Sequence, residues 1–149
     1  MKITHFLSAD HIIIDAAAAD KKKLLSELSR KAGAIVDVLP DRLLAELVKR
    51  EELGSTGMGG GVAIPHARFY QLTTPFGMLL RLRKPLDFDA VDGEPVDLVF
   101  LLLLPEAAAA GDQLGALASI ARKLRNPKTA AALRDAGNST EMYRILTAE

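Results

Sequence analysis

Residues 54–66 read Gly54-Ser55-Thr56-Gly57-Met58-Gly59-Gly60-Gly61-Val62-Ala63-Ile64-Pro65-His66, a glycine-dense loop followed by a short apolar run and a histidine behind a proline. Four of the eleven glycines of the chain lie between Gly57 and Gly61. Glycine allows positive φ and close approach of the backbone to a ligand, so we expect this loop to wrap around a ligand. Residues 62–64 are predicted to form a short buried strand. Pro65 stiffens the backbone that aims His66.

The composition is typical of a globular protein, and we expect residues 1–149 to form a single domain around one core. Nineteen basic residues balance nineteen acidic ones, which argues against nucleic-acid binding because such proteins carry a basic excess. The absence of cysteine excludes disulfides and cysteine nucleophiles. We see no signal peptide, and the apolar runs are too short to span a bilayer. We therefore expect a cytoplasmic protein without membrane insertion.

Apolar runs alternate with helical patterns, which predicts a mixed α/β domain. Strands are expected at residues 11–15, 76–82 and 96–104, and the last should be central because it is apolar almost throughout. The expected helices are 20–33, ended by Gly33, then 40–52, 114–125, 128–135 and 140–146. On the third of these, the expected apolar face is Leu114, Leu117, Ala118, Ala121 and Leu124. A turn is expected at Asp92–Gly93 and a loop or frayed turn at 106–111.

The glycine loop does not fit the known nucleotide-binding motifs. A P-loop requires lysine and then Ser or Thr after its last glycine, where this chain has Val62 and Ala63. The Rossmann motif requires a strand before the glycines and a helix after them, and the expected order here is the reverse. His5, His11 and His66 lack partners at metal-ligand spacing. We therefore expect neither a metal nor another cofactor, and interpret His5 and His11 as surface or hydrogen-bonded residues.

His66 admits two interpretations. It is either a core or loop histidine bonded to a carbonyl, or a functional residue in acid/base catalysis or phosphoryl acceptance. Neutral imidazole is a good nucleophile near pH 7 because its ordinary pKa is about 6.5. A phosphoryl group would bring roughly two negative charges, which require backbone N–H donors and an arginine nearby.

The glycine loop and the helix before it contain groups suited to that task. Arg50 can provide the guanidinium, and the loop can provide backbone N–H groups. The candidate phosphate-binding residues are Ser55, Thr56, Gly59 and Gly60. For Ser55 and Thr56 the alternative is that their hydroxyls merely cap or turn the loop.

A longer pattern surrounds His66. It comprises Glu51, Met58, Gly59, Val62, Ala63, Ile64, Pro65 and His66. With residues 50–57, 87–92 and 95–98, this pattern makes the chain resemble the fructose/mannitol/nitrogen-type enzyme IIA proteins of the bacterial phosphotransferase system. The likeness extends over nearly the whole chain and is greatest for the nitrogen-regulatory type, because no transport domain is fused to it.

The resemblance implies a compact α/β sandwich with a mixed sheet of about five strands flanked by helices. It implies that His66 is phosphorylated at Nε2 by a phosphorylated HPr-like carrier, called NPr in the nitrogen branch. The chain would then be a phosphoryl-transferring component and not an ATP-dependent kinase. Arg50 would steady the phosphoryl group. Many members have a second active-site histidine on the helix after the central strand, and here Gln113 takes that place.

Three functions follow from these considerations. The first is a regulatory phosphocarrier whose phosphorylation state changes its binding to target proteins in nitrogen or potassium regulation. The alternatives are a sugar-specific IIA component that passes the phosphoryl group to a IIB domain, and a binding module that is not phosphorylated. Because the net charge is near zero, we expect docking through an apolar patch formed by Met58, Phe69 and Tyr70, of which the last two are alternatively core residues.

Overall fold

The computed structural model describes residues 1–107 and 110–149, without the side chains of residues 110–113. Its strands are β1 Ile12–Ala16, β2 Gly57–Gly59, β3 Val62–Ala63, β4 His66–Phe69, β5 Phe76–Leu86 and β6 Val96–Pro105. In the described part of the chain they form one six-stranded mixed sheet in the order β1-β5-β6-β3-β2, with β4 also paired to β6. The expected α/β sandwich is confirmed. The sheet has six strands where about five were expected, and β2, in the glycine loop, and β4 are not among the strands expected from the sequence.

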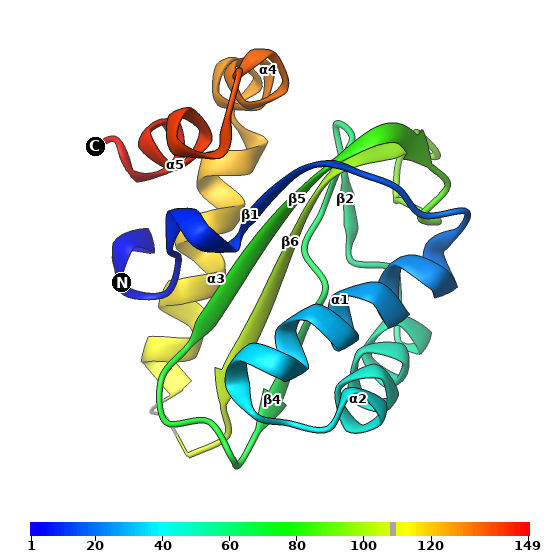
Figure 1. The fold of residues 1–149 in the computed structure, drawn as a ribbon, viewed down its shortest axis with the longest axis vertical. Coiled ribbons are helices and arrows are strands. Elements are labelled where there is room, and N and C mark those ends of the chain that lie inside the picture. The colour runs from blue at the N-terminus through cyan, green and yellow to red at the C-terminus, as the bar shows by residue number, and fades with distance from the viewer. Residues whose placement is uncertain (108–109) are drawn as a thin grey trace.

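Helices cover both faces of the sheet (Figure 1). The helices α1 Lys21–Val36 and α2 Pro40–Glu52 lie on one face. The other face carries α3 Ala110–Arg125, α4 Pro127–Asp135 and α5 Ser139–Thr147, together with the short 3-10 helices η1 Ile3–His5 and η2 Ala9–His11. Among the described helices, none combines the length and apolar character needed to cross a membrane.

The strand β6 is the centre of the core. Val99, Leu101 and Leu103 pack in the cluster with α1 and α2. Phe100 and Leu102, which alternate with them, pack in the cluster with α3, α4 and α5. All five side chains are fully buried. Because successive side chains of a strand point to opposite faces, a strand covered on both sides must be apolar throughout, and the expected central position is confirmed.

The first helix starts where the sequence predicts but ends later. The carboxylate of Asp20 accepts a hydrogen bond from the backbone N–H of Lys23 over 2.8 Å, which caps α1. The expected end at Gly33 is wrong, since the helix continues to Val36 and is followed by Asp37 in the left-handed region, with φ of 58°. A Cβ on Gly33 would lie 2.6 Å from the carbonyl oxygen of Val38. Glycine is therefore required there for close packing and does not terminate the helix.

The helix α3 also departs from the expectation. It begins at Ala110, so the expected loop at 106–111 is wrong for its last two residues, and residues 108–109 lie outside the described part. Its fully buried face contains Ala116, Ile120 and Leu124, whereas Leu114 is 66% exposed. Leu and Ala occupy several sides of this helix, so periodicity alone does not determine which side faces the sheet.

Candidate functional site: a histidine cleft between α2 and β4

The glycine loop forms the tip of the hairpin made by β2 and β3. Gly59, Gly60 and Gly61 have φ values of 95°, 67° and 79°, a run that only glycine adopts without strain. The backbone N–H of Gly60 donates to Asp92 over 3.0 Å, and its carbonyl oxygen accepts from Arg134 over 2.8 Å. The loop thus packs against other parts of its own chain.

Two residues that belong to neither strand, Ile64 and Pro65, connect the hairpin to His66 at the start of β4. β3 and β4 pair with β6 in one continuous parallel register, with Ala63 opposite Val99 and His66 opposite Leu102. Between them Pro65 has no N–H to give to the ladder. The carbonyl oxygen of Ile64 bonds locally, to the ring of His66.

His66 is half-buried at the start of β4. Its Nδ1 lies 2.8 Å from the carbonyl oxygen of Ile64. A carbonyl oxygen only accepts hydrogen bonds, so Nδ1 of the neutral ring carries the hydrogen and Nε2 keeps its lone pair. The bond to a carbonyl is the one expected of a structural histidine, but it also orients a nucleophilic Nε2.

A cleft of about 570 Å³ lies beside His66, with one wall from α2 and the other from β4 and the residues after it. Its lining residues are Arg42, Glu46, Lys49, Arg50, Leu53, His66, Ala67, Arg68, Phe69, Tyr70, Gln71 and Glu106. The structure therefore brings Arg50 and His66 into one cleft, and the expected role of Arg50 at the phosphoryl group stays a prediction. One N–H of the Arg50 guanidinium donates to the carbonyl oxygen of Gly54 over 2.7 Å, which fixes the side chain at the end of α2.

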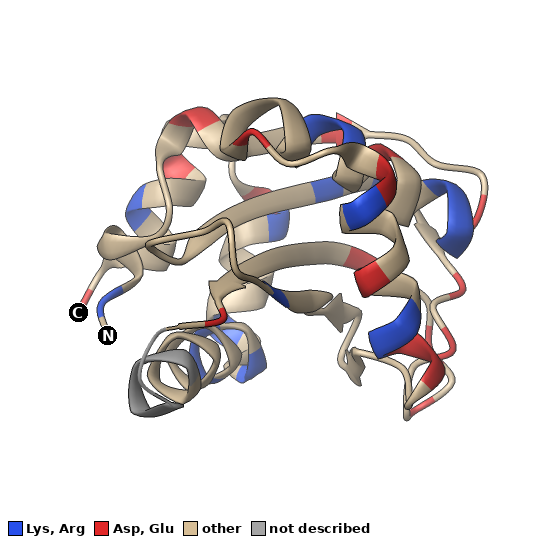
Figure 2. Cartoon of the chain, turned by 90° about the horizontal axis from the view of Figure 1, so that it is seen from below, with Lys and Arg blue, Asp and Glu red and all other residues tan. Residues whose placement is uncertain are grey.

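The lining of the cleft is more basic than the chain as a whole. It contains four cationic side chains, Arg42, Lys49, Arg50 and Arg68, and two acidic ones, Glu46 and Glu106. Elsewhere on the chain, basic and acidic residues alternate along helices, strands and loops (Figure 2). A chain with zero formal net charge thus has a locally cationic cleft, which the net charge does not reveal.

The surroundings of His66 lower its pKa below the ordinary value. Burial is the largest cause, because it disfavours the charged ring, and the positive charges of Arg50 and Arg68 act in the same direction. The hydrogen bond to Ile64 and the charge of Glu51 act in the opposite direction. The ring therefore stays neutral, and nucleophilic, to a lower pH than an unperturbed histidine.

The four candidate phosphate-binding residues have other partners, and none lines the cleft. Ser55 donates its hydroxyl hydrogen to the carbonyl oxygen of Phe88 over 2.6 Å and accepts from the N–H of Gly57. The hydroxyl of Thr56 donates to Glu51. Gly59 and Gly60 lie at the hairpin tip. Their expected phosphate contacts stay a prediction, and the observed contacts hold the loop in shape.

The expected docking residues divide between core and surface. Phe69 is buried, and Met58 packs against the core, whereas Tyr70 is 66% exposed under the guanidinium of Arg42. Leu53, at the opposite wall of the cleft, is 84% exposed. The accessible apolar surface beside His66 thus comes from Leu53 and Tyr70 and stands next to the cationic side chains.

Gln113 lies in the first turn of α3. Its side chain is outside the described part of the structure, so its expected contact with His66 stays a prediction.

Sequence reasoning missed Arg68, and it placed Glu51 in the pattern around His66 without assigning it a contact. Arg68 follows His66 by two residues in β4 and so lies on the same face of the strand, a period-two signal that was available in the sequence. The contacts of Glu51 were not foreseeable in this way, because they join the end of α2 to the loop and to the start of α1.

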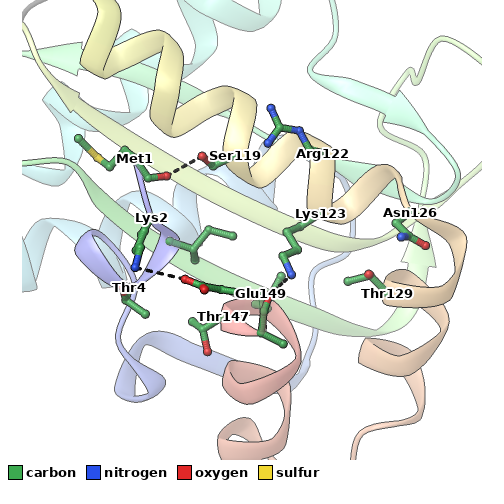
Figure 3. A pocket seen from close by; sticks show the side chains of 13 residues that line it. Met1, Lys2, Thr4, Ser119, Arg122, Lys123, Asn126, Thr129, Thr147 and Glu149 are labelled. Carbon is green, nitrogen blue, oxygen red and sulfur yellow. Dashed lines mark hydrogen bonds and ion pairs between the residues drawn. The ribbon is translucent and has the colours of Figure 1, made fainter.

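A second cavity, of about 540 Å³, lies where the two chain ends meet α3 (Figure 3). Ser119 donates to the carbonyl oxygen of Met1 over 2.6 Å, and Lys2 pairs with Glu149 over 3.2 Å. Lys123 donates to the carbonyl oxygen of Ala148. This cavity shares no lining residue with the His66 cleft. Within the described residues, no group of three or more His, Asp or Glu side chains is placed to hold a metal ion.

Known proteins are similar to this chain in both sequence and fold. A nitrogen regulatory protein of Bradyrhizobium diazoefficiens is 42% identical over 146 residues, which cover 98% of this chain and 95% of that protein. The crystal structure of the nitrogen regulatory protein IIA-Ntr from Neisseria meningitidis matches with a TM-score of 0.92 at 36% identity, over 97% of this chain and 99% of that one. Mannitol IIA from Escherichia coli matches in fold alone, with a TM-score of 0.76 at 18% identity over 94% and 98% of the two chains.

The sandwich with its histidine cleft is therefore built on the fold of the phosphotransferase-system IIA proteins. The family model described as phosphoenolpyruvate-dependent sugar phosphotransferase system, EIIA 2, matches residues 5–149. The chain belongs to this family, which makes it a phosphocarrier component of the phosphotransferase type.

Proposed function

We propose that this protein is a cytoplasmic regulatory phosphocarrier that accepts a phosphoryl group on Nε2 of His66 from a phosphorylated HPr-like protein such as NPr. One observation carries the proposal: Nδ1 of His66 bonds the carbonyl oxygen of Ile64 over 2.8 Å beside a cleft that Arg50 also lines. That bond leaves the lone pair of Nε2 available for attack.

In the proposed reaction the lone pair of Nε2 attacks the phosphorus of the donor's phosphohistidine. A new P–N bond forms to His66, the P–N bond to the donor breaks, and its electron pair returns to the donor's imidazole. The hydrogen on Nδ1 stays in its bond with Ile64 and stabilises the positive charge that develops on the ring. No nucleotide takes part.

Arg50 is proposed to bind the phosphoryl oxygens during transfer. A guanidinium has five N–H donors, and one of them is used by Gly54. The others remain for oxygens placed over His66, where a planar fork binds two oxygens at once. Gln113 is proposed as a neutral donor from the first turn of α3.

The regulatory output follows from the change of charge. Phosphorylation adds roughly two negative charges to a cleft lined by four cations. A target protein that binds the cationic, unphosphorylated surface would then be released. A target that binds the phosphorylated surface would be recruited. The similarity to nitrogen regulatory proteins supports targets in nitrogen regulation, and the proposal extends to potassium regulation. The family description names a sugar system, and this supports a second candidate, a IIA component that passes the phosphoryl group to a IIB domain.

The test is incubation with phosphoenolpyruvate, the first enzyme of the phosphotransferase system and HPr or NPr, followed by intact-mass measurement. We expect one acid-labile phosphoryl group, lost in His66→Ala and retained in the control variants His5→Ala and His11→Ala. Retention in His66→Ala would refute the assignment. Onward transfer to added IIB domains, but not altered binding to regulatory targets, would favour the sugar-specific alternative.

A further inference from the structure

The carboxylate of Glu51 is nearly enclosed, although it lies beside the exposed end of α2. Its side chain is 6% exposed. It accepts hydrogen bonds from the backbone N–H of Thr56 over 3.0 Å and from the Thr56 hydroxyl. A buried carboxylate is stable only when its oxygens are hydrogen-bonded and its charge is paired. The segment before the hairpin is therefore held where Glu51 is held.

Lys21 provides the opposite charge. Its Nζ lies 2.9 Å from Glu51, and its side chain is 19% exposed. The ammonium group also lies 4.6 Å above the ring of Phe88 and 3.7 Å from Asp89. Because Lys21 is the first residue of α1, the pair joins the start of one helix to the end of the other.

The contacts continue from Thr56 to His66. The carbonyl oxygen of Thr56 accepts from the N–H of Ile64 over 3.0 Å. The carbonyl oxygen of Ile64 then accepts from Nδ1 of His66 over 2.8 Å. Ile64 is thus bonded on both sides, with its N–H bound to the segment that Glu51 holds and its carbonyl aimed at the imidazole.

We propose that Glu51, fixed by Lys21, is a positioning residue for His66, which acts through Thr56 and Ile64 to hold the imidazole as the Nδ1–H tautomer with Nε2 free. This inference rests on the proposed function of His66 as phosphoryl acceptor. Glu51 does not line the cleft, so its role is assigned to the orientation of His66 and not to contact with the transferred group. Its neighbour Arg50 lines the cleft, so two consecutive residues divide the two tasks.

A second effect of Glu51 is electrostatic. Its negative charge favours protonation of His66, against the effect of burial and of the cations Arg50 and Arg68. Loss of that charge should lower the pKa of His66 further. Loss of the contacts should allow a mixture of the Nδ1–H and Nε2–H tautomers. The two effects are separable because the first changes a titration midpoint and the second changes the pattern of ring nitrogen signals.

The test compares Glu51→Gln with Glu52→Gln, a matched change at the next residue, whose side chain is exposed and outside the cleft. The imidazole ¹⁵N signals of His66 report the tautomer in the unphosphorylated protein. We expect a single Nδ1–H tautomer in the wild type and Glu52→Gln, and a mixture in Glu51→Gln. The kcat for phosphoryl acceptance should fall about tenfold in Glu51→Gln, by analogy with the loss when the hydrogen-bonding partner that orients a metal-bound histidine is removed, with an unchanged KM for the donor.

Two further variants keep the test decisive. Thr56→Val removes only the hydroxyl contact and should also produce a mixture of His66 tautomers. It provides the test even if Glu51→Gln folds poorly. Lys21→Met should add little to the loss in kcat in a Glu51→Gln background, because Lys21 acts through Glu51. A wild-type tautomer and kcat in folded Glu51→Gln or Thr56→Val would overturn the inference. If the wild type itself accepts no phosphoryl group, the proposed function fails, while the tautomer measurement still judges the positioning role.

Discussion

Arg50 and Glu51 are consecutive residues of α2 with opposite effects on His66. Arg50 lowers the pKa of the imidazole, and Glu51 raises it. Arg50 lies in the cleft and donates to the carbonyl oxygen of Gly54, while Glu51 accepts from the N–H of Thr56. The end of one helix therefore sets both the charge and the orientation of the ring.

The first prediction is a pair of opposite shifts in pH dependence. Phosphoryl acceptance requires neutral imidazole, so its rate should fall as His66 becomes protonated, below the ordinary midpoint of about 6.5. Arg50→Ala removes a positive neighbour and should move this acid limb to higher pH, whereas Glu51→Gln should move it to lower pH. The measurement is the transfer rate against pH together with NMR titration of the His66 ring. Shifts in the same direction in both variants would contradict this account.

The second prediction concerns the rate at neutral pH, where His66 is neutral in all variants. Arg50→Ala should slow phosphoryl acceptance, by less than the roughly 10²–10³-fold loss seen when a donor is removed from a dry site, because this cleft must open to a protein donor. Arg50→Lys should recover part of the rate, since an ammonium is a point charge without the planar fork. Arg83→Ala, at an exposed position of β5, is the control. A wild-type rate in folded Arg50→Ala would remove Arg50 from the site.

The third prediction separates two glycines of the hairpin tip. Both have positive φ, so alanine at either should cost about 1–2 kcal/mol of stability through left-handed strain. A Cβ on Gly60 meets no atom within 4 Å, whereas a Cβ on Gly61 would lie 2.5 Å from the guanidinium of Arg134. Gly61→Ala must shift the guanidinium of Arg134, the end of a flexible side chain that is paired with Asp97, and should cost up to about 1 kcal/mol more. Urea unfolding measures both costs, and the difference should shrink in an Arg134→Ala background.

In the glycine loop, the sequence predicted the backbone conformation but not the contacts. Its glycines predicted an unusual backbone, and the positive φ angles confirm that part. While the phosphate contact of Gly60 stays a prediction, its observed contacts come from Asp92 and Arg134, residues 32 and 74 positions away. No local pattern encodes such a contact, because it arises only when α4 packs beside the hairpin.

In the site, too, local features were predictable from the sequence and features that depend on tertiary packing were not. The stiff run Ile64-Pro65-His66 and the place of Arg50 at the end of α2 are local features, and they predicted that the two side chains act together, but not the cleft itself. The predicted end of α1 at Gly33 was wrong because this glycine is required for close packing against Val38. The cationic lining of the cleft was missed because Arg68 comes from β4, and a balanced total charge does not report how charges are distributed.

The fourth prediction follows from that lining. Arg68 is exposed on β4 and lines the cleft with three other cations, so association with a phosphorylated donor should be aided by attraction. The association rate should fall severalfold as salt is raised from low to physiological ionic strength. Arg68→Gln should weaken this dependence, whereas Lys84→Gln, exposed on β5 outside the cleft, should not. An association rate that does not change with salt would favour docking through Leu53 and Tyr70 alone.

The last prediction concerns Gln113, in the first turn of α3. An amide donates hydrogen bonds but stays neutral at every working pH, whereas a histidine would titrate near neutrality. A hydrogen bond from Gln113 to a charged phosphoryl oxygen would contribute about 1.5–3 kcal/mol, so Gln113→Leu should accept phosphate at least about tenfold more slowly. Gln113→His should remain active and gain a second titration in its pH profile. The measurements are the acceptance rate and the lifetime of the phosphohistidine in the three proteins. If leucine matches the wild type in both, Gln113 is only a polar residue of the helix, and the phosphoryl charge is balanced by Arg50 and the other cations of the cleft.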